Sequence, residues 1–313
     1  MLTFSKLTDL DAGLVGLGEI LLSAGYSFVT PTPASHGRVN ARSQNRWAED
    51  LRGVFGWSRP FRPGVLPGAI VEQMRAAEVL ETVAGGHRSA VRFSTLDGLL
   101  FAHSAFPTVQ EDAVFFGPDT YRFTRSIRHE LPARVRRAVD IGCGAGPGAI
   151  VVAEARRDAE VFAVDINEAA LRLTRVNAAL AGVSVDARRS DLLSGLDGSF
   201  DLIVANPPYL VDPGERTYRH GGGVLGADLS LKILETAIDR LAPGGKLILY
   251  TGAAIIGGVD PFLAESRSRL EGRGTAWTYE EIDPDVFGEE LEQGVYAAAE
   301  RIAAVLLTVT NKN

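Results

Sequence analysis

The sequence predicts an α/β protein in which a parallel sheet, covered by helices on both faces, follows a smaller, mainly helical domain and a β-hairpin. Three observations support this prediction: apolar side chains at helical spacing near the N-terminus, an alternating run around a tight turn, and later apolar runs separated by helical stretches. A length of 313 residues allows two cores. We expect a helical substrate-recognition domain over residues 1–86, a hairpin and linker over 87–117, and the α/β domain over 118–313.

Three helices are predicted in the N-terminal domain. Residues 6–24 place leucine and isoleucine three and four positions apart, which gives a helix with one apolar face. A second helix is expected over residues 44–55, and a third over 67–83 begins at Pro67, a residue suited to the first helical turn. Residues 30–38, TPTPASHGR, contain two prolines, a glycine and hydroxyl side chains, which predicts a loop.

The hairpin and the strands of the sheet come next. Residues 91–103 alternate in polarity on both sides of Asp97–Gly98, a dipeptide typical of hairpin turns. After residue 137, apolar runs typical of buried strands alternate with helical stretches, at 138–141, 161–164, 202–205 and 247–250. This alternation predicts parallel strands whose carboxyl ends share one edge, where open α/β sheets bind ligands. The acidic run from Tyr279 is expected to form an exposed loop and helix.

Composition and charge exclude several classes of protein. The net charge is −7 and the isoelectric point about 5.4, which argues against a generally basic surface but leaves room for a local cationic patch. Cys143 is the single cysteine, so an intrachain disulfide and a cysteine-based zinc site are excluded. No apolar run reaches the roughly 20 residues of a membrane span, and we expect a cytoplasmic protein. The spacing of the histidines predicts no metal site.

A glycine-rich turn, DIGCGAG, follows the first predicted strand and contains Asp140, Gly142, Gly144 and Gly146. Glycines allow the backbone to turn sharply and to approach a ligand at the positive end of a helix. The spacing also satisfies a dinucleotide-binding pattern, so a nicotinamide-dependent oxidoreductase is an alternative. Two details count against the oxidoreductase. Asp140 ends the strand, and a carboxylate there repels a pyrophosphate and suits a cationic ligand. Pro147 follows the last glycine of the turn.

Two further acids follow the next two strands of the predicted sheet. Asp165 ends the second strand, where a carboxylate can accept hydrogen bonds from both ribose hydroxyls of an adenosine. Asp191 follows the third strand, within reach of an adenine amino group. Either acid alone is equally well explained as a helix cap. Together with Asp140, on one edge of one sheet, they indicate a bound ligand.

The fourth strand ends in an unusual tetrapeptide, Asn206–Pro207–Pro208–Tyr209. Prolines fix φ and lack an N–H donor, so the Asn206 side chain and the proline carbonyls are available as acceptors directed at one spot. A planar NH₂ group satisfies such acceptors, and Tyr209 is placed to stack on its face. We interpret the tetrapeptide as a clamp for an amide or an aromatic amine.

These motifs, in this order, resemble those of the class I S-adenosylmethionine-dependent methyltransferases. The resemblance covers roughly residues 115–310 and implies a Rossmann-like, seven-stranded domain that uses S-adenosyl-L-methionine. The cofactor residues that it implies are Asp140, Gly142, Gly144, Gly146, Asp165, Ile166, Asp191, Leu192 and Asn206. The catalytic residues implied are Asn206, Pro207 and Tyr209, and the substrate-binding ones are Pro118, Thr120, Asn206, Pro208 and Tyr209.

Within this class, the chain is most similar to the protein-(glutamine-N5) methyltransferases that act on peptide chain release factors. These enzymes also join a small helical domain through a hairpin to the catalytic domain. Their P-R-P-E-T segment corresponds here to residues 116–120, in which Gly117 and Asp119 replace arginine and glutamate. Tyr250–Gly252 replaces the acidic ending of the family's fifth strand. The resemblance implies methylation of a glutamine side-chain amide in a protein such as a release factor.

Three alternatives remain open. Adenine N6 and guanine N2 present the same planar NH₂ group, so an RNA or DNA methyltransferase is the nearest one, and an arginine cluster within residues 122–137 favours it. The second alternative is a non-catalytic binding protein that retains the fold. The third is the nicotinamide-dependent oxidoreductase. Gly221–Gly223 is expected to form a mobile lid near the clamp. The sequence does not indicate the oligomeric state.

Overall fold

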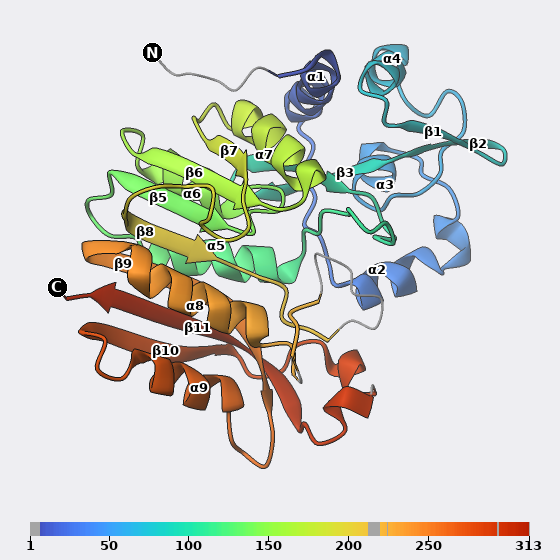
Figure 1. Ribbon diagram of the computed structural model, residues 1–313. Helices are drawn as coiled ribbons and strands as arrows, with labels where there is room; N and C mark the ends of the chain where they lie inside the picture. The colour runs from blue at the N-terminus through green and yellow to red at the C-terminus, as the bar shows by residue number, and fades with distance from the viewer. Residues whose placement is uncertain (1–6, 212–219, 224, 293, 313) are drawn as a thin grey trace.

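The computed structural model describes residues 7–211, 220–223, 225–292 and 294–312 of the chain (Figure 1). Its centre is a seven-stranded sheet with the strand order β10-β11-β9-β8-β5-β6-β7. The strands are β5 (Arg137–Ile141), β6 (Glu160–Asp165), β7 (Asp186–Arg189), β8 (Phe200–Ala205), β9 (Leu241–Ile255), β10 (Thr275–Asp283) and β11 (Arg301–Asn311). β11 pairs antiparallel with both neighbours, and the other described strands of this sheet run parallel to one another.

Both faces of the sheet are buried, as the continuous apolar runs predict. Alternate residues of β5 and β6 contribute to two separate cores: Ala138 and Val161 belong to one, Val139 and Phe162 to the other. The first core lies against α5 (Pro118–Glu130), α6 (Pro147–Ala155) and α7 (Glu168–Leu180). The second lies against α8 (Asp228–Arg240) and α9 (Pro261–Leu270), which are seen in front of the sheet in Figure 1. The predicted α/β fold is confirmed.

The N-terminal part packs beside the sheet and contains more strand than predicted. Its elements are α1 (Asp9–Ser23), α2 (Pro33–Asn40), the 3₁₀ turn η1 (Ser43–Asn45), α3 (Leu51–Phe55), α4 (Gly68–Ala76), β1 (Leu80–Val83), β2 (Gly86–Ser89), β3 (Val91–Leu96) and β4 (Leu99–Ser104). The helix predicted over residues 6–24 is present as α1, where Thr8 and Asp11 form a capping box. The hairpin predicted around Asp97–Gly98 is also confirmed.

Several element predictions were wrong. Residues 30–38 are not a loop, because Thr32 caps α2 and Pro33 occupies its first position. The helix predicted over 44–55 is divided between η1 and α3, since Asp50 starts a new helix. The helix predicted over 67–83 ends at Ala76, and its last residues form a second hairpin, β1–β2. The acidic run from Tyr279 begins in β10 instead of a loop, and its later part contains a 3₁₀ turn, η2 (Gly288–Glu292).

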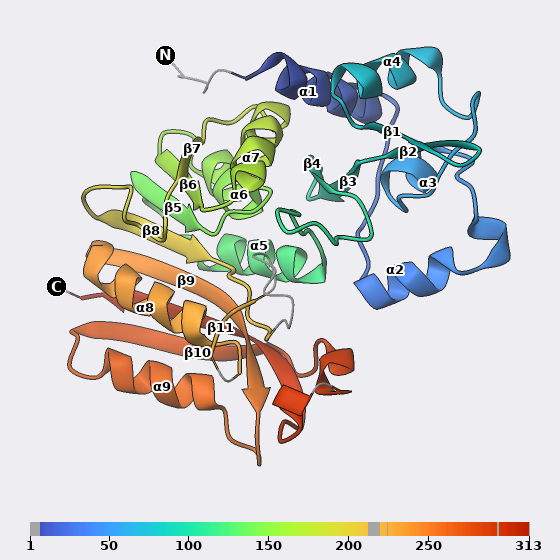
Figure 2. The ribbon, with the colours of Figure 1, turned by 45° about the vertical axis from the view of Figure 1, so that its right-hand side comes forward.

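α7 joins the N-terminal part to the sheet (Figure 2). Its Arg172 Nε donates to Asp11 of α1 over 2.6 Å. The buried Asn177 side chain accepts from the Ala102 N–H in β4 and donates to the carbonyls of Ala102 and Ala145 at 2.7–2.9 Å. Both contacts link segments that are far apart in the sequence. No helix among the residues that the structure describes is long and apolar enough to cross a membrane.

Candidate active site

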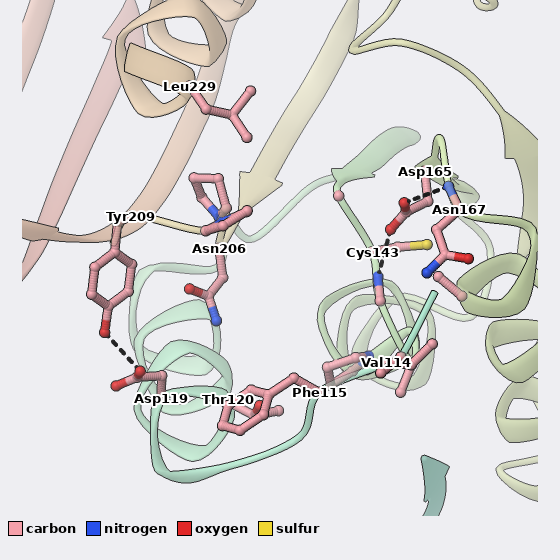
Figure 3. Close-up of a pocket in the computed structure, with 18 of the residues that line it drawn as sticks. Val114, Phe115, Asp119, Thr120, Cys143, Asp165, Asn167, Asn206, Tyr209 and Leu229 are labelled. Atoms are coloured by element: carbon pink, nitrogen blue, oxygen red, sulfur yellow. Dashed lines mark hydrogen bonds between the residues drawn. The ribbon is translucent and has the colours of Figure 1, made fainter. Parts of the chain in front are cut away.

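A cavity of about 410 Å³ opens at the carboxyl edge of the sheet. β5, β6 and β8 each deliver an acidic or amide side chain to it, from the last two residues of the strand or the residue just beyond, and α5 forms the opposite wall (Figure 3). The predicted residues that line the cavity are Thr120, Asp140, Gly142, Gly144, Asp165, Ile166, Asp191, Leu192, Asn206, Pro207, Pro208 and Tyr209. Gly146 and Pro118 lie outside this lining: they are the N-cap of α6 and the first residue of α5.

The glycine-rich turn has the backbone conformation that its sequence predicts. Gly142, Gly144 and Gly146 have φ values of 68°, 55° and 82°, in the left-handed region that side chains disfavour. The Gly144 N–H donates to Asp165 Oδ2 over 3.0 Å, and the Asn167 N–H donates to Oδ1 over 2.9 Å. Asp165 therefore holds the turn as well as facing the cavity.

Buried carboxylates give this half of the cavity a negative electrostatic potential. Asp140 is 1% exposed, and its Oδ2 accepts the Ala149 N–H over 2.9 Å. Burial raises the pKa of Asp140 to about 7; the Ala149 hydrogen bond opposes this shift and the charge of Asp165 adds to it. Burial also raises the pKa of Asp165. A cationic ligand relieves the cost of ionising both groups.

Two apolar residues beside the acids are unusually placed. Ile166 is 50% exposed although it lines the cavity, so its side chain is available to the flat face of a ligand ring. Leu192 has φ +49°, a conformation that costs a leucine about 1–3 kcal/mol and that is frequent at ligand sites. Asp191, immediately before it, is exposed at the cavity.

The clamp residues lie at the other end of the cavity. Figure 3 shows the Asn206 side chain between Tyr209 and the turn that carries Cys143. Within the described part of the chain, the Asn206 amide makes no hydrogen bond. Gly221 packs against this segment, since an added Cβ would lie 2.7 Å from the Pro208 carbonyl. An unpaired amide facing a cavity is ready to bind a planar polar group.

Tyr209 is held by its hydroxyl group. The ring is 6% exposed, the hydroxyl donates to Asp119 Oδ2 over 2.7 Å, and the ring edge faces Phe287 at a centroid distance of 5.8 Å. Burial, followed by the nearby Asp119 charge, raises the pKa of Tyr209 well above its usual value, so the phenol stays a donor. The predicted stacking role therefore applies to a ring whose orientation is set by Asp119.

Two of the departures from the family pattern, Asp119 and Tyr250, contact each other in the structure. Tyr250 in β9 donates to Asp119 Oδ1 over 2.8 Å, and Arg122 donates to the same oxygen over 3.1 Å. Asp119 is only 6% exposed and lies in the first turn of α5, where the helix dipole favours a carboxylate. Sequence reasoning did not identify this tyrosine–aspartate–tyrosine network, because Tyr250 is 131 positions from Asp119 and no local pattern connects them.

The substitution at Gly117 has a local explanation as well. A Cβ built on Gly117 would lie 2.5 Å from the Phe115 ring, so any side chain there displaces Phe115. Phe115 lines the cavity together with Phe106, Pro107 and Val109. The cavity lining on this side is thus mainly apolar, and this feature was not predicted from the sequence.

Cys143 lies in the glycine-rich turn with its side chain buried. The thiol is 3.4 Å from the Thr174 hydroxyl, and burial raises its pKa well above the usual value, so it is a poor nucleophile. In the described ranges, histidine, cysteine and acidic residues form no group of three or more arranged to hold a metal ion.

Comparison with known proteins shows which proteins the chain is similar to. Residues 109–255 match the family called Methyltransferase small domain. In solved structures, the fold is similar to that of a tRNA m1G37 methyltransferase from M. jannaschii, with a TM-score of 0.50 and 16% identity, covering 73% of this chain and 59% of that one. The sheet topology and this partial family match are those expected of a class I methyltransferase domain. The resemblance drawn from the motifs is therefore confirmed.

The chain is also similar to curated glutamine methyltransferases over part of their length. A release factor glutamine methyltransferase from Deinococcus radiodurans is 37% identical over 164 residues, which are 49% of this chain and 55% of the relative. A ribosomal protein uL3 glutamine methyltransferase from Neisseria meningitidis is 35% identical over 135 residues, 39% of this chain and 45% of the relative. The chain matches only 55%, 57% and 62% of the length of the first three relatives.

Proposed function

We propose that this protein transfers a methyl group from S-adenosylmethionine to the side-chain amide nitrogen of a glutamine in another protein. The observation that carries the proposal is the unpaired Asn206 amide, placed in one cavity with three strand-end acids. The names of the relatives support a glutamine acceptor, because both kinds are glutamine methyltransferases. We expect the acceptor to belong to the translation machinery and a release factor to be the first candidate, in the cytoplasm.

The residues of the cavity fit this cofactor. When bound, S-adenosylmethionine supplies an activated methyl group on a positively charged sulfur. The charges of Asp140 and Asp165 favour such a cation, and Asp165 and Asp191 offer acceptors for the ribose and adenine groups. The exposed Ile166 side chain offers a surface for the adenine ring. Asp165 in addition keeps Gly144 in place through its hydrogen bond.

The clamp has two roles toward the acceptor amide. Asn206 Oδ1 and the Pro207 carbonyl accept the two N–H bonds, which orients the nitrogen lone pair and holds it near the site of transfer. The same acceptors stabilise the positive charge that develops on nitrogen during transfer. Because an amide lone pair is delocalised, such acceptors also favour a pyramidal nitrogen. The Asp119–Tyr209 hydrogen bond ties the end of the clamp to α5.

A base in RNA or DNA is the alternative acceptor, and the arginine cluster at residues 122–137 was the feature in its favour. Three members of this cluster are engaged with acids: Arg122 with Asp119 and Asp283, Arg128 with Asp97 and Glu154, and Arg137 with Glu160. The cluster therefore gives less support to a nucleic-acid acceptor than the sequence suggests.

The proposal is tested with radiolabelled S-adenosylmethionine and lysate from cells that lack the gene. We expect labelled product that protease destroys and ribonuclease leaves intact, and label in N5-methylglutamine after hydrolysis. Label that is lost to ribonuclease alone would establish a base as the acceptor. The substitution Asn206→Ala is expected to lower turnover by about 100-fold or more, the effect of removing one transition-state hydrogen-bonding group. Calorimetric binding of S-adenosylmethionine should persist in this variant, and unchanged turnover contradicts the clamp.

A further inference from the structure

A second set of arginines, in the N-terminal part, has no acidic partners among the described residues. Residues 30–68 contain six arginines, no lysine and two acids, Glu49 and Asp50, although the whole chain has a net charge of −7. Five of the arginines are exposed and Arg59 is half-buried. In contrast to Arg122, Arg128 and Arg137, none of the six forms an ion pair with a residue that the structure describes. We call Arg38, Arg42, Arg46, Arg52, Arg59 and Arg62 the arginine face.

Two direct contacts link neighbouring segments of this part of the chain. The Arg59 Nε donates to Asn40 Oδ1 over 2.9 Å, which places it beside the end of α2, next to Arg38 and Arg42 in the chain. A bridge between Ala48 and Phe61 sets the segment after Arg46 beside the segment before Arg62. These two contacts bring Arg59 and Arg62 to the segments that carry the arginines of α2 and the residues after it.

Aromatic rings lie between the guanidinium groups. Arg59 lies over the Trp57 ring at 5.3 Å and Arg62 over the Trp47 ring at 5.0 Å. Both tryptophans are half-buried, so each presents an edge or face to solvent beside a cation. Phosphate-binding guanidinium groups next to aromatic surfaces are the combination that single-stranded RNA sites use for backbone and bases.

The arginine face also adjoins the candidate active site. Pro33, the first residue of α2, lines the cavity. Three residues later, the His36 ring packs on Phe106, another lining residue, with ring centroids 4.1 Å apart. Figure 2 shows α2 extending away from the carboxyl edge of the sheet. A molecule bound along α2 therefore reaches the entrance of the cavity.

We propose that the arginine face binds the phosphate backbone of single-stranded RNA. The six arginines form no ion pair with a described residue. A polyanion offers a regular series of phosphates to such a set of cations, whereas an acidic protein needs a matching array of carboxylates. The interleaved tryptophans favour RNA between these two partners. RNA held there places an RNA-associated acceptor protein beside the cavity; this last step rests on the proposed function, whereas RNA binding itself does not.

The test measures the anisotropy of a fluorescein-labelled 20-nucleotide RNA of mixed sequence at 50–200 mM NaCl. Each neutralised phosphate contributes about −0.7 to the slope of log K against log salt, so six contacts give a slope of about −4. We expect the substitutions R38Q, R42Q and R46Q, combined in one protein, to reduce the slope to about −2 and the affinity at 50 mM salt at least tenfold.

The matched control combines R125Q, R134Q and R136Q, three exposed arginines of the other cluster whose side chains form no ion pair with a described acid, and should change the affinity less than twofold. Circular dichroism melting checks that both proteins fold, and a milder pair, R46Q with R62Q, replaces the triple variant if it does not. No RNA binding at 50 mM salt, or an equal loss in both variants, overturns the proposal. Equal competition by polyglutamate assigns the face to an acidic protein instead. Methylation is not measured, so this proposal and the proposed function fail separately.

Discussion

Asp140 shows how one buried residue can link ligand charge to pH. Its pKa is raised to about 7, first by burial, so in the free protein the carboxyl is protonated below pH 7 and ionised above it. A sulfonium ligand interacts favourably with the ionised form only. Binding should therefore release a proton near pH 7, and affinity should fall as pH falls through the pKa.

We predict that S-adenosylmethionine binds about tenfold more weakly at pH 6 than at pH 8, because one pH unit below the pKa leaves about a tenth of Asp140 ionised. S-adenosylhomocysteine, which lacks the positive charge, should show a smaller change. Isothermal titration calorimetry of both ligands at the two pH values measures this. The substitution Asp140→Asn should flatten the difference. Identical pH profiles for the two ligands would contradict the assignment.

At the residue scale, the sequence identified what lies at strand ends and missed what is assembled from distant segments. Asp140, Asp165 and Asn206 lie at the carboxyl ends of recognisable apolar runs, so their convergence follows from the parallel sheet alone. Asp119 and Tyr250 come from α5 and β9, and their contact depends on how that helix packs on the sheet. Long-range packing of this kind leaves no periodic signal in the sequence.

Helices and strands were predicted well where burial sets the spacing of the apolar residues. They were predicted poorly where helix capping or strand pairing defines the element. The inner strands, such as β5 and β8, are apolar on both faces, whereas α2 has little apolar character and is defined by Thr32 and Pro33 at its start. β10 was missed because it is an edge strand with acids such as Glu280 and Glu281, which protect a free edge from pairing. Polarity at such an edge resembles that of a loop.

Gly252 in β9 packs directly against the Tyr209 ring. A Cβ at this position would lie 2.2 Å from the Tyr209 ring, so Gly252→Ala forces the ring away from β9. We expect a loss of about 1–3 kcal/mol in the free energy of unfolding, the usual cost of overpacking. Because Tyr209 ends the clamp, turnover should fall more than the affinity for S-adenosylmethionine. Urea unfolding and steady-state kinetics measure the two effects.

Gly37 in α2 provides the matched control. It lies inside a helix, and a methyl group added there would have no described atom within 4 Å beyond its own helix and chain neighbours. Gly37→Ala should therefore stabilise the protein by about 0.5–1 kcal/mol without altering turnover. If the Gly252 variant behaves like this control, the close packing between β9 and Tyr209 has no functional consequence.

At the scale of the whole molecule, the N-terminal part and the sheet share one of the two cores. Leu14 and Leu17 of α1, Phe101 of β4, and Ile150 and Val176 of the sheet helices belong to the same buried cluster. A shared core argues for one cooperative unfolding transition, since neither part can lose its packing alone. The shared core also fixes the position of the N-terminal part beside the cavity. Substrate recognition by residues 1–86 stays a prediction.

Asn177 links the N-terminal part to the glycine-rich turn. Its side chain makes three hydrogen bonds, two with Ala102 in β4 and one with the carbonyl of Ala145 in that turn. Asn177→Ala leaves those backbone groups buried and unpaired, which should cost about 3–5 kcal/mol and lower Tm by roughly 5–10 °C. We expect calorimetry to show one transition at the lower temperature, together with weaker binding of S-adenosylmethionine. Asn45→Ala, which removes one bond at the half-buried end of the N-terminal helices, is the control and should shift Tm far less. Two resolved transitions, with only one of them moved, would mean that the N-terminal part unfolds independently and that the cavity is assembled from two separable bodies.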